Sequence, residues 1–180
     1  NLPIEQLREE GVAVTGFWFN PNIHPYTEYQ ARKRTLEEYA RETGMNLAIG
    51  GTYDLRPFIT AVAGDIDGRC AYCYRVRMEA AARYAAGNGF DSFTTSLLIS
   101  PYQNHGAIAA AAREMGEKYG VEFLYRDFRP LFQEGQQFAR EHGFYMQKYC
   151  GCIFSEEDRY MAAKRKKKAR AREDGVNEHG

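Results

Sequence analysis

The residues best suited to chemistry in this sequence are its four cysteines, which form two close pairs, Cys70/Cys73 and Cys150/Cys152. No export signal is visible, and in such a chain close cysteine pairs indicate metal or redox sites rather than structural disulfides. Thiolates are soft ligands for zinc and iron–sulfur clusters, and paired thiols can also store electrons as a dithiol. We therefore expect a metal centre, a redox-active dithiol, or both.

The first pair, Cys70-Ala-Tyr-Cys73, is predicted to open a helix over residues 70–86. The i, i+3 spacing puts both sulfurs on one face of that helix. A helix N-terminus favours thiolates, so we expect a lowered thiol pKa. Two thiolates do not complete the four-ligand shell of a tetrahedral zinc or a cubane cluster, and further ligands must come from elsewhere. The alternative is a pair of small core residues.

The second pair has only Gly151 between its cysteines, and glycine permits the tight backbone that two such close sulfurs need. A disulfide across so small a ring departs from relaxed geometry and is easily reduced. The pair therefore suits a switchable dithiol or two ligands to one metal. Two alternatives use the cysteines differently. In the first, all four cysteines form one Cys₄ zinc site in a zinc-stabilised RNA-binding module. In the second, Cys70 and Cys73 are the dithiol of a metal-free thiol–disulfide oxidoreductase.

The elements that must position these cysteines alternate between strands and helices. This order predicts an α/β fold: a mostly parallel, Rossmann-like sheet with helices on both faces and a helical C-terminal part. Because the chain opens with a helix, the first strand of such a fold is missing from it. Strands are expected at 12–19, 47–50, 93–99 and 121–125, and helices at 2–10, 29–43, 57–62, 70–86, 107–118, 133–142 and 156–172.

The charge pattern divides the chain at its C-terminal end. We expect a single α/β catalytic domain over 1–163 and a basic tail over 164–180, which carries a balance of +4 against −4 for the rest. A basic tail on an acidic body suggests a polyanionic partner, and a frayed, solvated terminus is the alternative. No apolar run approaches the roughly 18 residues of a membrane span, so no membrane partner is expected.

Five segments in this order resemble the successive blocks of the QueH epoxyqueuosine reductases, and the resemblance runs from about residue 11 to about residue 160. The segments are GFWFNPNIHPYTEYQARK, GRCAYCYRVRMEAAARYA, SFTTSLLISPYQNH, FLYRDFRPLFQEGQQFARE and YMQKYCGCIFSEEDRY. Any single block, such as the CxxC pair, is much less specific than the ordered set.

This resemblance implies a cytoplasmic bacterial enzyme that performs the last step of queuosine biosynthesis. It would reduce epoxyqueuosine at the wobble position of tRNA to queuosine, taking up two electrons and two protons and releasing water. The resemblance implies a [4Fe-4S] cluster held by Cys70 and Cys73 together with an adjacent Cys-Cys pair. Cys150 and Cys152 would be catalytic, either as a redox-active pair or as ligands of an additional iron. The electron donor is unidentified.

The family's adjacent Cys-Cys pair follows its first strand, and these 180 residues contain no such pair. We expect the strand and its cysteines to precede Asn1, because the rest of the pattern is undamaged.

Loops after strands gather at the carboxyl edge of a parallel sheet, where sites form. A base in a single-stranded tRNA loop is read by stacking and by edge hydrogen bonds. Tyrosines can stack on such a base or pack in the core, and cationic side chains can contact phosphate or, as Arg129 with Asp127, form an internal ion pair. The expected substrate contacts are His24, Tyr26, Tyr102, Arg129, Lys148 and Tyr149.

Overall fold

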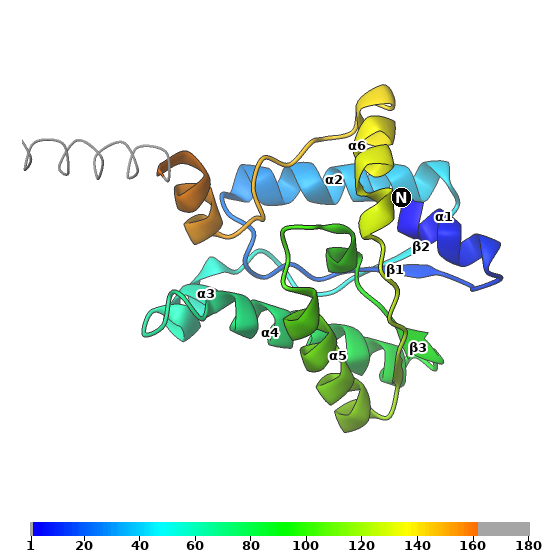
Figure 1. The fold of residues 1–180 in the computed structure, drawn as a ribbon, viewed down its shortest axis with the longest axis horizontal. Coiled ribbons are helices and arrows are strands. Elements are labelled where there is room, and N and C mark those ends of the chain that lie inside the picture. The colour runs from blue at the N-terminus through cyan, green and yellow to red at the C-terminus, as the bar shows by residue number, and fades with distance from the viewer. Residues whose placement is uncertain (1, 162–180) are drawn as a thin grey trace, which may run out of the picture.

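The computed structural model describes residues 2–161 and shows short parallel strands surrounded by helices (Figure 1). The elements run in the order α1 (Leu2–Glu9), β1 (Thr15–Trp18), α2 (Tyr26–Glu42), β2 (Asn46–Ile49), α3 (Leu55–Val62), α4 (Arg69–Gly87), β3 (Ser92–Phe93), η1 (Ser96–Ile99), α5 (His105–Tyr119), β4 (Glu122–Phe123), η2 (Arg129–Leu131) and α6 (Phe132–Glu141). Residues 153–161 form a further helix. The predicted tail, 164–180, lies outside the described residues.

Neighbouring residues of β1 show why helices cover both faces of the strands. Side chains alternate along a strand, so Phe17 and Trp18 point to opposite faces. Phe17 stacks on Tyr84 of α4, with ring centroids 4.4 Å apart. Trp18 donates its indole N–H to Tyr29 of α2 over 3.1 Å. Accordingly, α2 and α4 lie on opposite sides of β1 and β2 in Figure 1. The predicted α/β class with helices on both faces is confirmed.

The strands form two parallel pairs instead of one continuous sheet. β1 pairs with β2, and β3 pairs with β4. In the Rossmann order 3-2-1-4-5 the first strand is central, and without it the order contains these same two pairs. The predicted parallel pairing is therefore confirmed, although the strands form two separate pairs and not one sheet.

The largest core cluster joins α4 to α5 through small residues. Ala82 and Ala112 have no exposed surface, which lets the two helices approach closely, and longer side chains fill the space around them. These longer residues include Met78, Ile108 and Met115. The core therefore fixes the end of α4 that carries the CxxC pair relative to the loop that precedes α5.

The largest error of prediction concerns residues 93–99, which were expected as one strand. The strand contains only Ser92–Phe93, and Ser96–Ile99 form a 3₁₀ turn capped by Thr95, whose hydroxyl accepts a hydrogen bond from the N–H of Leu97. A short apolar run has no periodicity that separates strand from turn. The strands expected at 12–19 and 121–125 are also shorter, Thr15–Trp18 and Glu122–Phe123. Tyr26, expected in a loop, is the first residue of α2.

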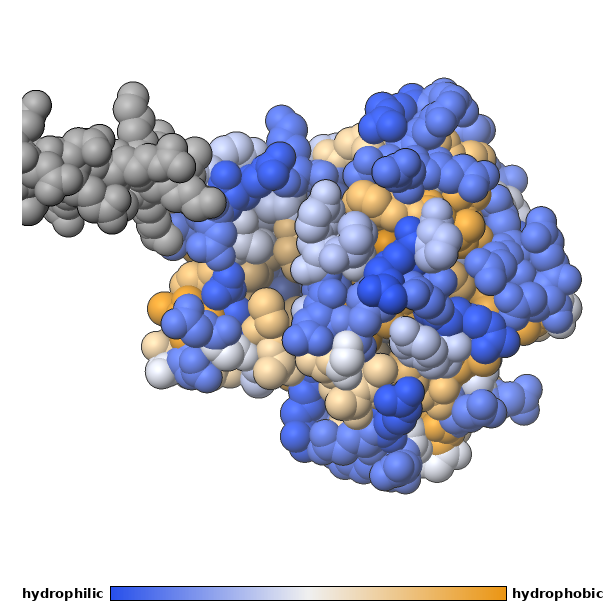
Figure 2. Space-filling model, in the orientation of Figure 1, coloured by the Kyte–Doolittle hydropathy of each residue, from blue (hydrophilic) through white to orange (hydrophobic). Residues whose placement is uncertain are grey.

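The face of the molecule seen in Figure 2 is mainly hydrophilic, with hydrophobic surface in separate areas between the polar side chains. The large exposed apolar side chains include several tyrosines, among them Tyr26, Tyr102 and Tyr160. Tyrosine is amphipathic and suits a wet surface. Within residues 2–161 no helix combines the length and hydropathy needed to cross a membrane.

Candidate active site

The fold brings both cysteine pairs to one place. Cys70 and Cys73 lie in the first turns of α4, while Cys150 and Cys152 lie in the segment before the helix at 153–161. Cys152 is buried in a small cluster with Phe58 of α3, and Cys73 packs against the same cluster. All four cysteines are free thiols. Residues separated by about 80 positions in the sequence therefore share one thiol-rich site.

The predicted lowering of the thiol pKa values in the CxxC pair is wrong. Burial raises the pKa of Cys73 to about 12, and the positive charge of Arg77 opposes this only in part. Burial likewise raises the pKa of Cys70, although Arg69 opposes it. Thiolates at Cys150 and Cys152 would raise both values further. Desolvation therefore outweighs the helix N-terminus. These thiols become thiolates where a metal ion replaces the proton.

Three of the four sulfurs accept a hydrogen bond from an N–H group. The side-chain amide of Asn22 donates to Sγ of Cys73 over 3.3 Å, and the amide of Gln103 donates to Sγ of Cys150 over 3.3 Å. The backbone N–H of Ser155 donates to Sγ of Cys152 over 3.4 Å. Hydrogen bonds to sulfur stabilise its anionic form and tune the potential of a bound iron–sulfur group.

The orientation of Gln103 is fixed by a neighbour. Its Oε1 accepts a hydrogen bond of 2.7 Å from the hydroxyl of Tyr74, so its N–H₂ group must face Cys150. Tyr74 follows Cys73 in the sequence and is buried. Burial raises its pKa to about 12, so its hydroxyl keeps its proton and donates. Neither Gln103 nor Asn22 was expected from the sequence as a site residue, although each lies in a loop that follows a predicted strand.

The thiols of Cys70 and Cys73 have the chemistry that an iron–sulfur group requires of its ligands. Cys70 and Cys73 present two soft ligands one turn apart, and the amide of Asn22 supports one of them. The Oδ1 atom of Asn22 is buried without a hydrogen-bond partner among the described residues. Within residues 2–161 no three His, Cys, Asp or Glu side chains are grouped to hold a metal ion. By number alone, the two thiols of the CxxC pair could supply half of the ligands of a four-cysteine shell.

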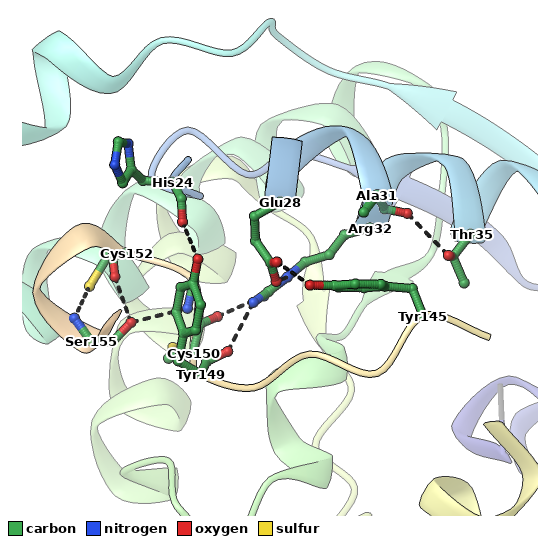
Figure 3. Close-up of polar contacts among 11 residues, drawn as sticks. His24, Glu28, Ala31, Arg32, Thr35, Tyr145, Tyr149, Cys150, Cys152 and Ser155 are labelled. Atoms are coloured by element: carbon green, nitrogen blue, oxygen red, sulfur yellow. Dashed lines mark hydrogen bonds and ion pairs between the residues drawn. The ribbon is translucent and has the colours of Figure 1, made fainter. Parts of the chain in front are cut away.

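The expected substrate residues fall into two groups. His24 and Tyr149 lie against the CxC segment. The hydroxyl of Tyr149 donates to the carbonyl of His24 over 2.6 Å (Figure 3). The N–H of His24 donates to the carbonyl of Gly151 over 2.8 Å. Tyr102 immediately precedes Gln103 and is 85% exposed. The exposed ring of Tyr102 makes an edge contact with Phe132 and lies next to the hydrogen-bond partner of Cys150, so it suits stacking on a base.

The other expected contacts have different surroundings. The hydroxyl of Tyr26 accepts a hydrogen bond from Gln30, and about half of its surface is exposed. Lys148 is exposed next to the CxC segment. Arg129 forms two hydrogen bonds, of 2.8 and 2.6 Å, with the carboxylate of Asp127, which is the internal ion pair weighed as its alternative.

The Asp127–Arg129 pair gives a pH prediction. Hydrogen bonds from the side chain and the N–H of Arg129 lower the pKa of Asp127 to about 2. The stabilisation is thus present above the ordinary aspartate pKa of about 3.9 and is lost as the pH falls toward 2. An Arg129→Met variant should titrate Asp127 nearer 3.9, as followed by NMR of the carboxyl carbon. Since both groups are exposed, the free energy of unfolding should change little.

The control for this titration is Arg126→Met, which removes a guanidinium that pairs with Glu10 instead. It should leave the Asp127 titration unchanged. A wild-type Asp127 that titrates at its ordinary pKa would show that the ion pair does not persist in solution.

Fold and site together define an α/β protein that gathers two thiol pairs at the carboxyl end of parallel strands. A sequence model of the epoxyqueuosine reductase QueH family matches residues 1–158. The chain belongs to the epoxyqueuosine reductase QueH family.

Curated relatives agree with this assignment, and each is named epoxyqueuosine reductase QueH. The protein from Dehalococcoides mccartyi is 36% identical over 153 residues, which covers 85% of this chain and 84% of the relative. The protein from Thermotoga maritima is 37% identical over 148 residues, or 77% of each chain. The protein from Helicobacter pylori is 33% identical over 157 residues, or 81% of this chain and 42% of the relative. The predicted family is thereby confirmed.

Proposed function

We propose that this protein reduces epoxyqueuosine to queuosine in tRNA, in the cytoplasm, with a [4Fe-4S] cluster and a redox-active CxC pair. Membership of the QueH family supports the reaction. The observation that carries the cysteine roles is the convergence of Cys70/Cys73 and Cys150/Cys152 from distant parts of the sequence. A pair of partly buried thiols beside a second pair is suited to passing electrons to a substrate.

The reaction balances as one epoxide, two electrons and two protons giving one alkene and one water. The epoxide oxygen leaves as its two bonds to carbon break and the carbon–carbon double bond forms. A bound [4Fe-4S] cluster would supply electrons singly, drawn from an external donor of unidentified nature. Cys70 and Cys73 would hold two of its irons. The family's adjacent Cys-Cys pair, the expected source of the other two ligands, is not among these 180 residues.

The residues of this chain would hold the substrate and manage its protons. Cys150 is exposed and can reach a bound base, whereas Cys152 is buried behind it. As a dithiol, the pair can give up two electrons and two protons while its sulfurs join in a disulfide. Gln103 would hold Cys150 in place, and Tyr102 would stack on the base. In the alternative role, both sulfurs would hold an additional iron, which would supply Lewis-acid chemistry for the departure of the oxygen.

The test uses the protein as its natural gene encodes it, purified without oxygen. Reduced protein incubated with epoxyqueuosine-containing tRNA should yield queuosine, measured by mass spectrometry of the digested nucleosides. Iron and sulfide should each approach about four per chain. One iron in excess of sulfide, lost in Cys152→Ser, would assign the CxC pair to an additional iron. Stoichiometric zinc without sulfide, and no queuosine, would favour the zinc-stabilised RNA-binding module instead.

A further inference from the structure

The CxC segment is held by an ion pair on α2 that is buried too deeply to be an ordinary surface pair. Nε of Arg32 donates to Oε1 of Glu28 over 2.7 Å, and the two side chains are only 11% and 7% exposed. Removing two charges from water is costly, and the cost is offset only where hydrogen bonds satisfy the remaining donors and acceptors. The partners of this pair therefore show what it does.

The remaining donors of Arg32 reach across the structure to the CxC segment. Nη1 donates to the carbonyl of Cys150 over 2.8 Å, and Nη2 donates to the carbonyl of Tyr149 over 2.9 Å. Glu28 accepts a second hydrogen bond from the hydroxyl of Tyr145. Figure 3 shows this network, with Arg32 pointing from α2 toward the segment at 149–150. The planar guanidinium thus binds two successive carbonyls as a fork, which lysine cannot do.

Gly151 makes room for this contact. Its φ of +138° lies in the region that favours glycine, and a Cβ there would lie 3.1 Å from Nη1 of Arg32 and 3.2 Å from Ile23. The carbonyl of Gly151 accepts the N–H of His24 over 2.8 Å. The absence of a side chain between the two cysteines therefore allows the close approach of the guanidinium.

These contacts to the cysteine segment use the main chain and leave the sulfurs to other partners. Sγ of Cys150 faces Gln103, and Sγ of Cys152 accepts from Ser155. Arg32 therefore fixes the backbone that carries both thiols without taking part in their chemistry.

We propose that Arg32, oriented by Glu28, is a positioning residue that sets where the sulfurs of Cys150 and Cys152 lie for the reaction. This inference rests on the proposed reductase function. A displacement of about 1 Å at a reacting group can cost roughly a hundredfold in rate, so the effect should fall on kcat. Recognition of the tRNA through other residues should be largely kept, so KM should change little.

The test compares Arg32→Met and Arg32→Lys with wild type. Arg34→Met is the matched control, because Arg34 is exposed on the same helix. In Arg32→Met, kcat for queuosine formation should fall about a hundredfold with KM within about threefold. Arg32→Lys keeps the positive charge beside Glu28 but loses the forked contact with the two carbonyls. Its kcat should therefore lie between that of wild type and that of Arg32→Met. Arg34→Met should behave as wild type.

A second measurement, amide hydrogen exchange, separates positioning from general loss of stability and does not depend on activity. Peptides covering residues 145–155 should exchange at least about tenfold faster in Arg32→Met, since two charge-assisted hydrogen bonds are lost. Peptides from α4 and α5 should be unchanged. Unaltered exchange at 145–155, or equal acceleration in α4, would overturn the inference. If wild-type protein forms no queuosine, the reductase proposal fails, while the exchange data still decide whether Arg32 holds this segment.

Discussion

Replacing Cys73 with serine is expected to abolish both the binding of the iron–sulfur cluster and the formation of queuosine. Serine keeps the shape of the side chain, but its hydroxyl is a hard, weakly acidic group that does not replace a thiolate on iron. Loss of a supporting neighbour typically costs 10–100-fold in metal affinity, so loss of a ligand should cost at least about 100-fold. The measurements are iron, sulfide and the visible spectrum of protein purified without oxygen, together with the nucleoside assay.

Cys152→Ser is the matched control, because it removes a second buried sulfur from the same apolar cluster. If the CxC pair acts in turnover, this variant should keep four irons and four sulfides, roughly, and lose queuosine formation. Normal iron and sulfide contents in Cys73→Ser would remove Cys73 from the ligand set. Loss of both in Cys152→Ser would instead assign the CxC pair to the cluster.

Replacing Gly116 with alanine is expected to cause the largest loss of stability among simple substitutions that add a single methyl group near the sheet. Gly116 lies on α5 where the helix packs against β4, and a Cβ would come within 2.7 Å of the carbonyl oxygen of Val121. The N–H of Val121 also donates to the carbonyl of Gly116, which holds the two segments together. Such overpacking typically costs 1–3 kcal/mol, so we expect about 2–3 kcal/mol.

Gly106→Ala on the same helix is the control, because its Cβ would make only an ordinary 3.5 Å contact with Oδ1 of Asn104. Alanine favours helix over glycine by up to about 1 kcal/mol, so this variant should be as stable as wild type or slightly more stable. Urea denaturation followed by circular dichroism measures both. Equal midpoints for wild type and Gly116→Ala would mean that α5 and β4 can separate at no cost.

The sequence was most informative where one strong local signal acts alone. The helix that begins with the CxxC pair was expected over 70–86 and extends over Arg69–Gly87. An alanine-rich sequence between two glycine-containing turns leaves few alternatives to a helix. The strand predicted at 93–99 was wrong, because an apolar run such as Leu97, Leu98 and Ile99 is compatible with a strand and with a 3₁₀ turn alike. The decisive contact there, the Thr95 cap, is visible only in three dimensions.

For the site, too, features set by local sequence could be predicted, and contacts between distant residues could not. The cysteines were found from their spacing, whereas their partners were not. Arg32 and Cys150 are 118 positions apart, and Glu28–Arg32 has the i, i+4 spacing that is common on exposed helix surfaces. Nothing local shows that this pair is buried. Asn22 and Gln103 could have been nominated, since each is an amide in a loop that follows a predicted strand.

The alanine contact between α4 and α5 has a mechanical consequence for the site. Close-packed helices resist sliding, so we expect α4 and α5 to behave as one rigid body. Cys70 and Cys73 open α4, and Gln103 stands just before α5, so all three travel with that body. The carbonyls of Tyr149 and Cys150 are held from α2, while Cys152 packs in the cluster that contains Phe58 and Cys73. The hydrogen bond from Gln103 to Cys150 therefore links this body to the segment that Arg32 holds, and its length would report any change in the separation of the thiol pairs.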